Sequence, residues 1–245
     1  MRVLSLTSPP MKGDDVKNAQ RRLRAAGAWS GKIDGVFGEQ TARACTQAKW
    51  LLGYTEKNIR PTYGTDLNAY LTGTKKPTLL MQQRVKSRKP KNLGEAALVV
   101  ARSFIGTKEE PPNSNRTMFS SWYGITGPWC LMFVTYCFNS VGSKHFKPGV
   151  RWAYCPFMVN DARAQRYGLN VVPKNKVKAG DIVLFDWKGD GVSDHVGIVS
   201  VAPNKHGDFK AIEGNTSHGN DSDGGAVMVR DRNVKQVICF VRVWE

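Results

Sequence analysis

Apolar residues recur at helical spacing in the first part of the chain. Val16, Ala19 and Leu23 lie three to four residues apart with polar residues between them, which is the pattern of a helix with one buried face. The same pattern predicts three helices in all, near residues 14–27, 40–52 and 66–71. Glycines follow these runs and favour their ends. We therefore expect residues 1–72 to form a small bundle of three helices.

The pattern breaks at residues 73–94. This stretch holds seven Lys or Arg residues and no acid, and it contains Pro77 and Pro90. Like charges repel one another, and proline interrupts regular structure. We expect an exposed basic linker here.

Residues 95–245 begin with helical patterns and end with strand patterns. Helices are predicted near residues 95–104, 129–141 and 157–165. After Gly180, short apolar runs separated by Gly, Asp and Asn predict strands at residues 182–187, 195–201, 210–213, 226–230 and 237–243. Helices followed by a run of short antiparallel strands indicate an α+β fold.

Charge is distributed unevenly along the chain. The 245 residues include 36 Lys and Arg against 20 Asp and Glu, which gives a net charge of +16. Residues 1–94 hold 18 of these cations and only 6 of the acids. A basic front half indicates an anionic partner, and charge alone leaves nucleic acid, an acidic membrane and an anionic cell-wall polymer open.

The first residues do not resemble a secretion signal. A short apolar run is followed at once by Pro9 and Pro10, with neither a long apolar segment nor a cleavage site of small residues. No apolar run approaches the roughly 20 residues that a membrane span needs. We therefore expect a protein that starts in a cytoplasm and has no transmembrane segment.

The five cysteines are odd in number, and none is spaced as Cys-x-x-Cys. Without a secretion signal, a disulfide framework or a zinc ribbon is disfavoured. Cys45, Cys137 and Cys239 fall on apolar positions and are expected to pack in cores. The pattern around Cys155 assigns it no role. Cys130 alone stands at the start of a predicted helix, directly after Gly127-Pro128-Trp129.

Three residue types of a nucleophilic site stand at the ends of predicted elements. Unpaired backbone N–H groups and the helix dipole favour a thiolate at Cys130, and the same groups can stabilise an oxyanion. His195 opens one predicted strand and Glu213 ends the next. Taken singly, Cys130 is equally well interpreted as a buried packing residue and His195 as a solvent-facing or core histidine, and both alternatives stay open. Carboxylate, imidazole and thiol in that order form an activated nucleophile. Asn215 adds a hydrogen bond to this site or is a plain turn residue; both interpretations stay open.

Four segments resemble those of CHAP domains, the cysteine, histidine-dependent amidohydrolases/peptidases. They are residues 128–134 (Pro-Trp-Cys-Leu-Met-Phe-Val), 179–185, 194–199 and 213–215, with a further similar stretch at 115–124. The resemblance implies a papain-like fold in which Cys130 is the nucleophile, His195 the base, Glu213 the third member and Asn215 an assisting residue. It also implies amide hydrolysis in peptidoglycan, at the N-acetylmuramoyl–L-alanine bond or at a peptide bond.

Three residues near the predicted nucleophile are candidate substrate contacts. These are Trp129, Tyr123 and Asn115. The alternative is that they only pack the helix that carries Cys130.

Residues 32–41 (Lys-Ile-Asp-Gly-Val-Phe-Gly-Glu-Gln-Thr) resemble the three-helix peptidoglycan-binding domain found beside many wall hydrolases. The glycines and Asp34 are expected to form turns and Phe37 to lie in the core. The resemblance implies an N-terminal wall-binding domain at 1–72, a basic linker at 73–94 and a C-terminal CHAP domain at 95–245. This is the organisation of a bacteriophage endolysin.

Metal catalysis and nucleic-acid binding compete with this interpretation. No two Cys or His residues stand three or four residues apart, as zinc ligands usually do. Residues 186–194 have Lys188 where a calcium loop needs a ligand, and residues 117–129 contain no acid. We expect no metal and no cofactor. Trp29 and Trp50 offer stacking groups for nucleic acid, but no known nucleic-acid motif accompanies them.

The sequence therefore predicts a peptidoglycan hydrolase with Cys-His-Glu catalysis. Its expected partners are peptidoglycan and anionic wall polymers, without nucleic acid, and the protein is expected to be a monomer that stays in the host cytoplasm until it is released to the wall. A non-catalytic wall-binding protein or a basic nucleic-acid-binding protein is the alternative function.

Overall fold

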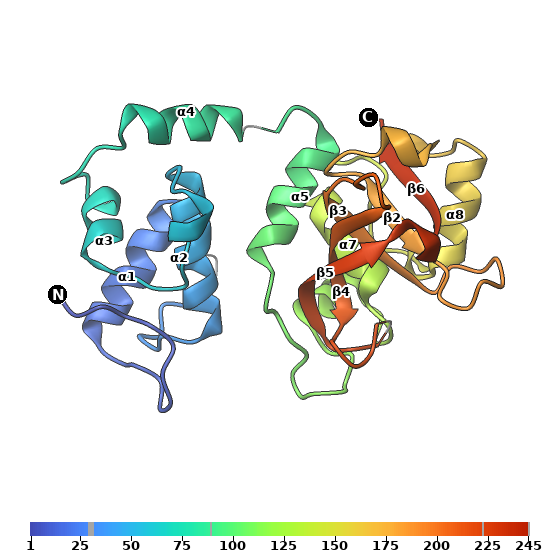
Figure 1. Cartoon of the computed structure of the whole chain (residues 1–245). Helices are drawn as coiled ribbons and strands as arrows, with labels where there is room; N and C mark the ends of the chain where they lie inside the picture. Colours follow the sequence, from blue (N-terminus) through green and yellow to red (C-terminus); the bar gives the residue numbers. More distant parts are fainter. Residues whose placement is uncertain (29–31, 89, 222, 245) are drawn as a thin grey trace. The chain divides into compact units, whose positions relative to one another are not determined.

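A computed structural model describes residues 1–28, 32–88, 90–221 and 223–244 of the chain. The chain divides into two compact units, Met1–Lys89 and Pro90–Glu245 (Figure 1). Trp29, for which we considered a stacking role, lies outside the described residues, as does Lys89 of the expected linker.

The first unit contains the three expected helices. They are α1 (Asp14–Ala25), α2 (Glu39–Leu51) and α3 (Thr65–Leu71), with a short 3-10 helix η1 (Glu56–Asn58) before α3. Their apolar faces meet in one core that includes Val16, Leu23 and Phe37. Gln20 is buried beside this core, where its amide oxygen accepts a hydrogen bond from the Gly35 N–H at 3.0 Å. The loop between α1 and α2 is thereby fixed to α1.

A fourth helix, α4 (Leu79–Ser87), lies within the range expected to be an exposed linker. The Thr78 side chain caps it by accepting the Met81 N–H, and Met81 is buried. Arg84 and Arg88 donate to backbone carbonyls of Gly53 and Trp50 at 2.6 and 2.8 Å. These carbonyls lie at the C-terminal end of α2, where the helix dipole attracts cations. Part of the basic segment is therefore packed on the first unit.

The second unit has helices before strands, as expected for an α+β fold. Its helices are α5 (Leu93–Ser103), α6 (Met118–Tyr123), α7 (Cys130–Asn139) and α8 (Cys155–Arg163), with the 3-10 helix η2 (Val150–Ala153) before α8. The strands are β1 (Leu169–Val172), β2 (Ile182–Phe185), β3 (His195–Val201), β4 (Asp208–Thr216), β5 (Ala226–Asn233) and β6 (Val237–Val243), and two further 3-10 turns are η3 (Lys174–Lys176) and η4 (Val234–Gln236). The α+β prediction is confirmed.

The strands form one antiparallel sheet in the order β1-β6-β2-β3-β4-β5. Helices α5 and α7 pack against β3 and β4 (Figure 1). Successive side chains of a strand point to opposite faces. On β3, Val196 and Ile198 join the core with the helices, whereas Val199 joins a smaller core on the other face. His195 lies on the same face as Val199. Because it is the first residue of β3, it lies at the end of the strand.

In the second unit, helix α6 and strand β1 were not expected from the sequence. Helix α6 is held by a capping box in which Thr117 accepts from the Ser120 N–H at 3.2 Å and Ser120 accepts from the Thr117 N–H at 2.9 Å. Strand β1 pairs with β6 at the edge of the sheet. Among the described residues, no helix is both long enough and apolar enough to cross a membrane.

Candidate active site

Cys130 is the first residue of α7 and is buried. The first N–H groups of a helix lack partners within the helix and point their positive ends toward this position. A hydrogen bond with Cys155 is the largest cause that lowers the pKa of Cys130 well below its usual value. The His195 imidazole and the Leu131 N–H act in the same direction, whereas burial opposes them. The site therefore favours a thiolate at Cys130.

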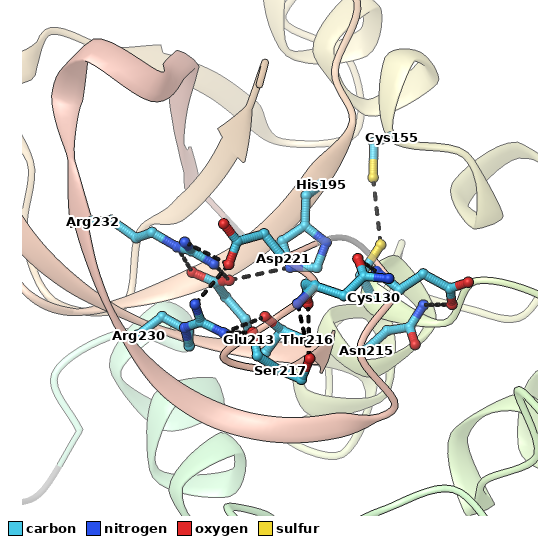
Figure 2. Close-up of polar contacts among 12 residues, drawn as sticks. Cys130, Cys155, His195, Glu213, Asn215, Thr216, Ser217, Asp221, Arg230 and Arg232 are labelled. Atoms are coloured by element: carbon cyan, nitrogen blue, oxygen red, sulfur yellow. Dashed lines mark hydrogen bonds and ion pairs between the residues drawn. The ribbon is translucent and has the colours of Figure 1, made fainter. Parts of the chain in front are cut away.

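Cys155 is the first residue of α8 and is also buried. Its sulfur lies 3.9 Å from that of Cys130 (Figure 2). The hydrogen bond to Cys130 raises the pKa of Cys155 well above its usual value, and burial adds to this. These opposite shifts favour the thiol form at Cys155 and the thiolate form at Cys130.

His195 is fully buried, and its imidazole lies between Cys130 and Glu213 (Figure 2). Its Nε2 is 3.2 Å from Oε2 of Glu213. The ring packs near Phe185 and Trp187, with centroids 6.0 and 6.1 Å away. Burial lowers the pKa of His195, but the Cys130 sulfur and the Glu213 carboxylate outweigh it and raise this pKa to about 9. The imidazole is therefore protonated at neutral pH.

Glu213 comes from β4 and is fully buried. Burial raises its pKa, but the opposing contacts of Arg232 and then His195 are stronger, so the pKa of Glu213 is lowered. On β3, Gly197 stands opposite Glu213 in the register. A Cβ atom at Gly197 would lie 2.7 Å from Cγ of Glu213. The absence of a side chain at Gly197 leaves room for the carboxylate.

Arg232 of β5 also holds the Glu213 carboxylate. Its Nε and Nη2 donate to Oε1 and Oε2 of Glu213 at 2.9 and 2.6 Å. The guanidinium also lies over the Trp187 ring, 4.8 Å from its centroid. Nη1 pairs with Asp221 at 3.0 Å, and Arg230 pairs with the same carboxylate at 2.6 Å (Figure 2). The two arginines connect the loop after β4 to the third member of the predicted triad.

Asn215 is buried near the end of β4 and has a left-handed backbone, with φ of 58°. Asparagine tolerates this conformation better than most residues. Its Nδ2 donates to Asp223 at 3.2 Å, and its Oδ1 accepts from the Gly225 N–H at 3.4 Å. These contacts organise the turn that follows β4, and the assisting role of Asn215 stays a prediction.

The candidate substrate contacts differ in their environments. Trp129 is fully buried, where its Nε1 donates to Glu109 at 2.8 Å and its ring stacks on Phe119. Tyr123 is also buried, and its hydroxyl donates to the Gly149 carbonyl at 2.7 Å. These contacts favour packing roles for both residues. Asn115 is half-buried with a φ of 54°. Substrate binding by these three residues stays a prediction.

In the acidic turn before His195, backbone N–H groups already bind the carboxylate of Asp186. Asp186 accepts hydrogen bonds from the N–H groups of Gly189 and Gly191 at 2.7 and 2.9 Å. This geometry is that of a hairpin turn. Across residues 1–28, 32–88, 90–221 and 223–244, no three His, Cys, Asp or Glu side chains are grouped as a metal site requires.

Two family models match the sequence. Residues 122–215 match the CHAP domain, and this range contains Cys130, His195, Glu213 and Asn215. This match lies within the second unit. Residues 12–48 match the family described as "Putative peptidoglycan binding domain". A peptidoglycan-binding match before a CHAP match is consistent with the architecture of an endolysin.

One solved structure similar to this chain is the crystal structure of a wild type endolysin, LysIME-EF1. It is 15% identical, with a TM-score of 0.44 over 61% of this chain. The chain spans 63% of the length of that endolysin. No curated protein matches the sequence.

Sequence reasoning missed two members of the site. Cys155 belongs to no recognisable motif. Its position directly before Pro156, a residue that favours the first turn of a helix, is the signal that the sequence contains. Arg232 lies 19 residues from Glu213 on the next strand. In the sequence it follows Arg230 and Asp231, beyond the predicted strand at 226–230, and this polar run gives no sign of a buried role.

Proposed function

We propose that this protein is a peptidoglycan hydrolase of the endolysin type that cleaves an amide bond with Cys130, His195 and Glu213. The observation that carries this proposal is the position of the His195 imidazole between the Cys130 sulfur and the Glu213 carboxylate, with Nε2 and Oε2 3.2 Å apart. The CHAP and peptidoglycan-binding matches support the same substrate class.

The first half-reaction forms a thioester. The Cys130 thiolate attacks the amide carbonyl carbon, and the carbonyl oxygen takes the negative charge. N–H groups of the first turn of α7 are placed to stabilise that oxyanion. When the C–N bond breaks, His195 donates its proton to the departing amine. The imidazole is then neutral.

The second half-reaction releases the acyl group. The neutral His195 takes a proton from water, and the resulting hydroxide attacks the thioester carbon. The C–S bond breaks, Cys130 leaves as a thiolate and His195 is again protonated. Glu213 remains ionised throughout because Arg232 neutralises it within the sheet. Its charge holds the imidazole in place and stabilises the protonated form.

The first unit is proposed to hold the enzyme on the wall. The peptidoglycan-binding match lies in this unit, and residues 1–94 carry 18 cations against 6 acids. Anionic polymers of the wall would be attracted to this charge. The bond is proposed to be either the N-acetylmuramoyl–L-alanine amide or a peptide bond of the stem or cross-bridge.

Clearing of purified bacterial cell walls tests the proposal. Wild type and Cys130→Ala are compared by loss of turbidity, with mass spectrometry of the released fragments. Cys137→Ala is the matched control, because Cys137 is buried on the same helix two turns further along. We expect wild type and Cys137→Ala to clear the walls and Cys130→Ala to be inactive, and the fragment masses identify the bond.

Two outcomes contradict the proposal. Equal clearing by wild type and Cys130→Ala would make Cys130 a packing residue. Wall binding without any clearing, on walls of varied composition, would favour a non-catalytic wall-binding protein.

A further inference from the structure

The N-terminal ends of two helices meet in the second unit. Cys130 is the first residue of α7, which has 10 residues, and Cys155 is the first residue of α8, which has 9. Their sulfurs are 3.9 Å apart and both residues are buried, with 5% exposure each. The positive ends of two helix dipoles therefore act on one pair of sulfurs. Such a pair is suited to carry one negative charge.

The neighbours of the pair decide which sulfur carries the charge. The His195 imidazole lies beside Cys130 and is itself held by Glu213 (Figure 2). Cys155 contacts the same sulfur from a different helix, α8 (Figure 2). The charge is stabilised on Cys130 by the cation, so the proton remains on Cys155. A thiol is a weak donor, but an ionised acceptor strengthens any hydrogen bond that it receives.

We propose that Cys155 is a second functional thiol of the site, whose S–H group donates a hydrogen bond to the Cys130 thiolate and stabilises it. This inference rests on the proposed function and goes beyond the Cys-His-Glu set. Because Cys155 contacts the reacting sulfur, its effect is expected on the ionisation of Cys130.

The hydrogen bond acts differently at each stage of the reaction. It is strongest when Cys130 is a free thiolate and is weakened when the sulfur is bound in a thioester, because the charge has then left. Removing it lowers the fraction of thiolate at acid pH. The thiolate that remains is more basic and more nucleophilic. Loss of Cys155 is therefore expected to shift the acid limb of activity to higher pH.

Cys137 shows what a cysteine without this arrangement does. It is fully buried on α7, and burial raises the pKa of its thiol well above the usual value. Burial by itself thus favours the neutral thiol. The difference between Cys130 and Cys137 arises from the helix start, the imidazole and the Cys155 thiol.

Alkylation of Cys130 tests the proposal without using the wall. The full-length protein receives short pulses of iodoacetamide across the acid and neutral pH range, and mass spectrometry quantifies the peptide that contains Cys130. Wild type, Cys155→Ala, Cys155→Ser and the control Cys137→Ala are compared, with circular dichroism as a check of folding. In Cys155→Ala we expect the alkylation midpoint of Cys130 to rise by about one pH unit, which is a tenfold loss of thiolate on the acid side.

The serine variant separates hydrogen bonding from packing. Cys155→Ser keeps a donor, so its midpoint is expected to return most of the way to that of wild type, and Cys137→Ala should match wild type. An unchanged midpoint in folded Cys155→Ala would overturn the inference. If Cys155→Ala does not fold, Cys155→Ser alone decides: a Cys130 midpoint about one pH unit above that of wild type in this variant would overturn the inference. If the midpoint shifts in Cys155→Ala but the wild-type protein clears no walls, the hydrogen bond between the two sulfurs is supported and only the proposed function is contradicted.

Discussion

Arg232 and Glu213 form a buried bidentate ion pair directly behind the imidazole of His195. The two N···O distances are 2.9 and 2.6 Å, and the carboxylate is fully buried. Bidentate pairs of this kind fix orientation as well as charge. The charge that His195 experiences from Glu213 is therefore set by a residue of a third strand, which itself stands outside the predicted triad.

Replacing Arg232 by methionine should destabilise the second unit. The change leaves Glu213 as a buried charge without its main partner, and breaking such a pair typically costs about 3–5 kcal/mol. Urea unfolding measures this loss. Arg242→Met is the matched control, since Arg242 holds Asp181 with two contacts of 2.8 Å each but is more exposed. If both variants lose equally little stability, the Arg232–Glu213 pair does not have the importance assigned to it.

The pH dependence of kcat/KM should be bell-shaped. The pKa of Cys130 is lowered by Cys155 and His195, so its thiolate is present above that lowered pKa. The pKa of His195 is raised to about 9, so its imidazolium is present below about pH 9. The active ion pair exists between these two limits, and activity is lost as pH falls through the first or rises through the second. An alkaline limb close to the ordinary pKa of histidine would contradict the assigned ion pair.

Gly197→Ala should lower activity strongly. The new Cβ would lie 2.7 Å from Cγ of Glu213 and 3.0 Å from the Ile212 carbonyl oxygen, so the carboxylate must move. Misplacement of a catalytic group by about 1 Å typically costs about 100-fold in rate. Gly219→Ala is the control, because no atom lies within 4 Å of a Cβ there. Steady-state wall clearing, with folding checked by circular dichroism, distinguishes the two variants. Equal activities would show that Glu213 tolerates displacement.

Hydrogen peroxide should inactivate the protein reversibly. The Cys130 thiolate attacks peroxide to give a sulfenic acid and hydroxide, and the Cys155 thiol then displaces water to form a disulfide. Dithiothreitol should restore activity by reducing that bond. In Cys155→Ala the sulfenic acid has no neighbouring thiol and is oxidised further, so recovery should be lost. Peptide mapping identifies the linked pair, and full recovery of the alanine variant after excess peroxide would contradict this chemistry.

Much of the fold follows from local patterns. Helices α1, α2 and α7 and strands β2 to β6 coincide with apolar periodicities of 3.6 or 2, and their ends carry glycines or turn residues. Helix α6 depends on a capping box with Ser120 in place of the usual Glu or Gln, which makes it inconspicuous in the sequence. The basic composition around α4 indicated a linker. The helix there depends on contacts with carbonyls of α2, which no local pattern contains.

The same distinction applies to the site. Cys130, His195 and Glu213 stand at the ends of their elements in the sequence, and the structure brings their side chains together. Cys155 and Arg232 contribute through contacts between residues that are distant in the sequence: Cys155 is 25 positions from Cys130, and Arg232 is 19 positions from Glu213. Their roles depend on how α8 and β5 pack, and packing is decided by the whole core.

The strand order β1-β6-β2-β3-β4-β5 has a consequence for biosynthesis. Strand β6 (Val237–Val243) is translated after the other five strands of the described sheet, yet it separates β1 from β2. Until the ribosome has released it, β1 lacks a partner and one edge of β2 remains open. A nascent chain that already contains Cys130, His195 and Glu213 therefore has an unfinished sheet. We expect lytic capacity to arise only after translation has passed residue 243, so that an interrupted synthesis yields no partly active fragment.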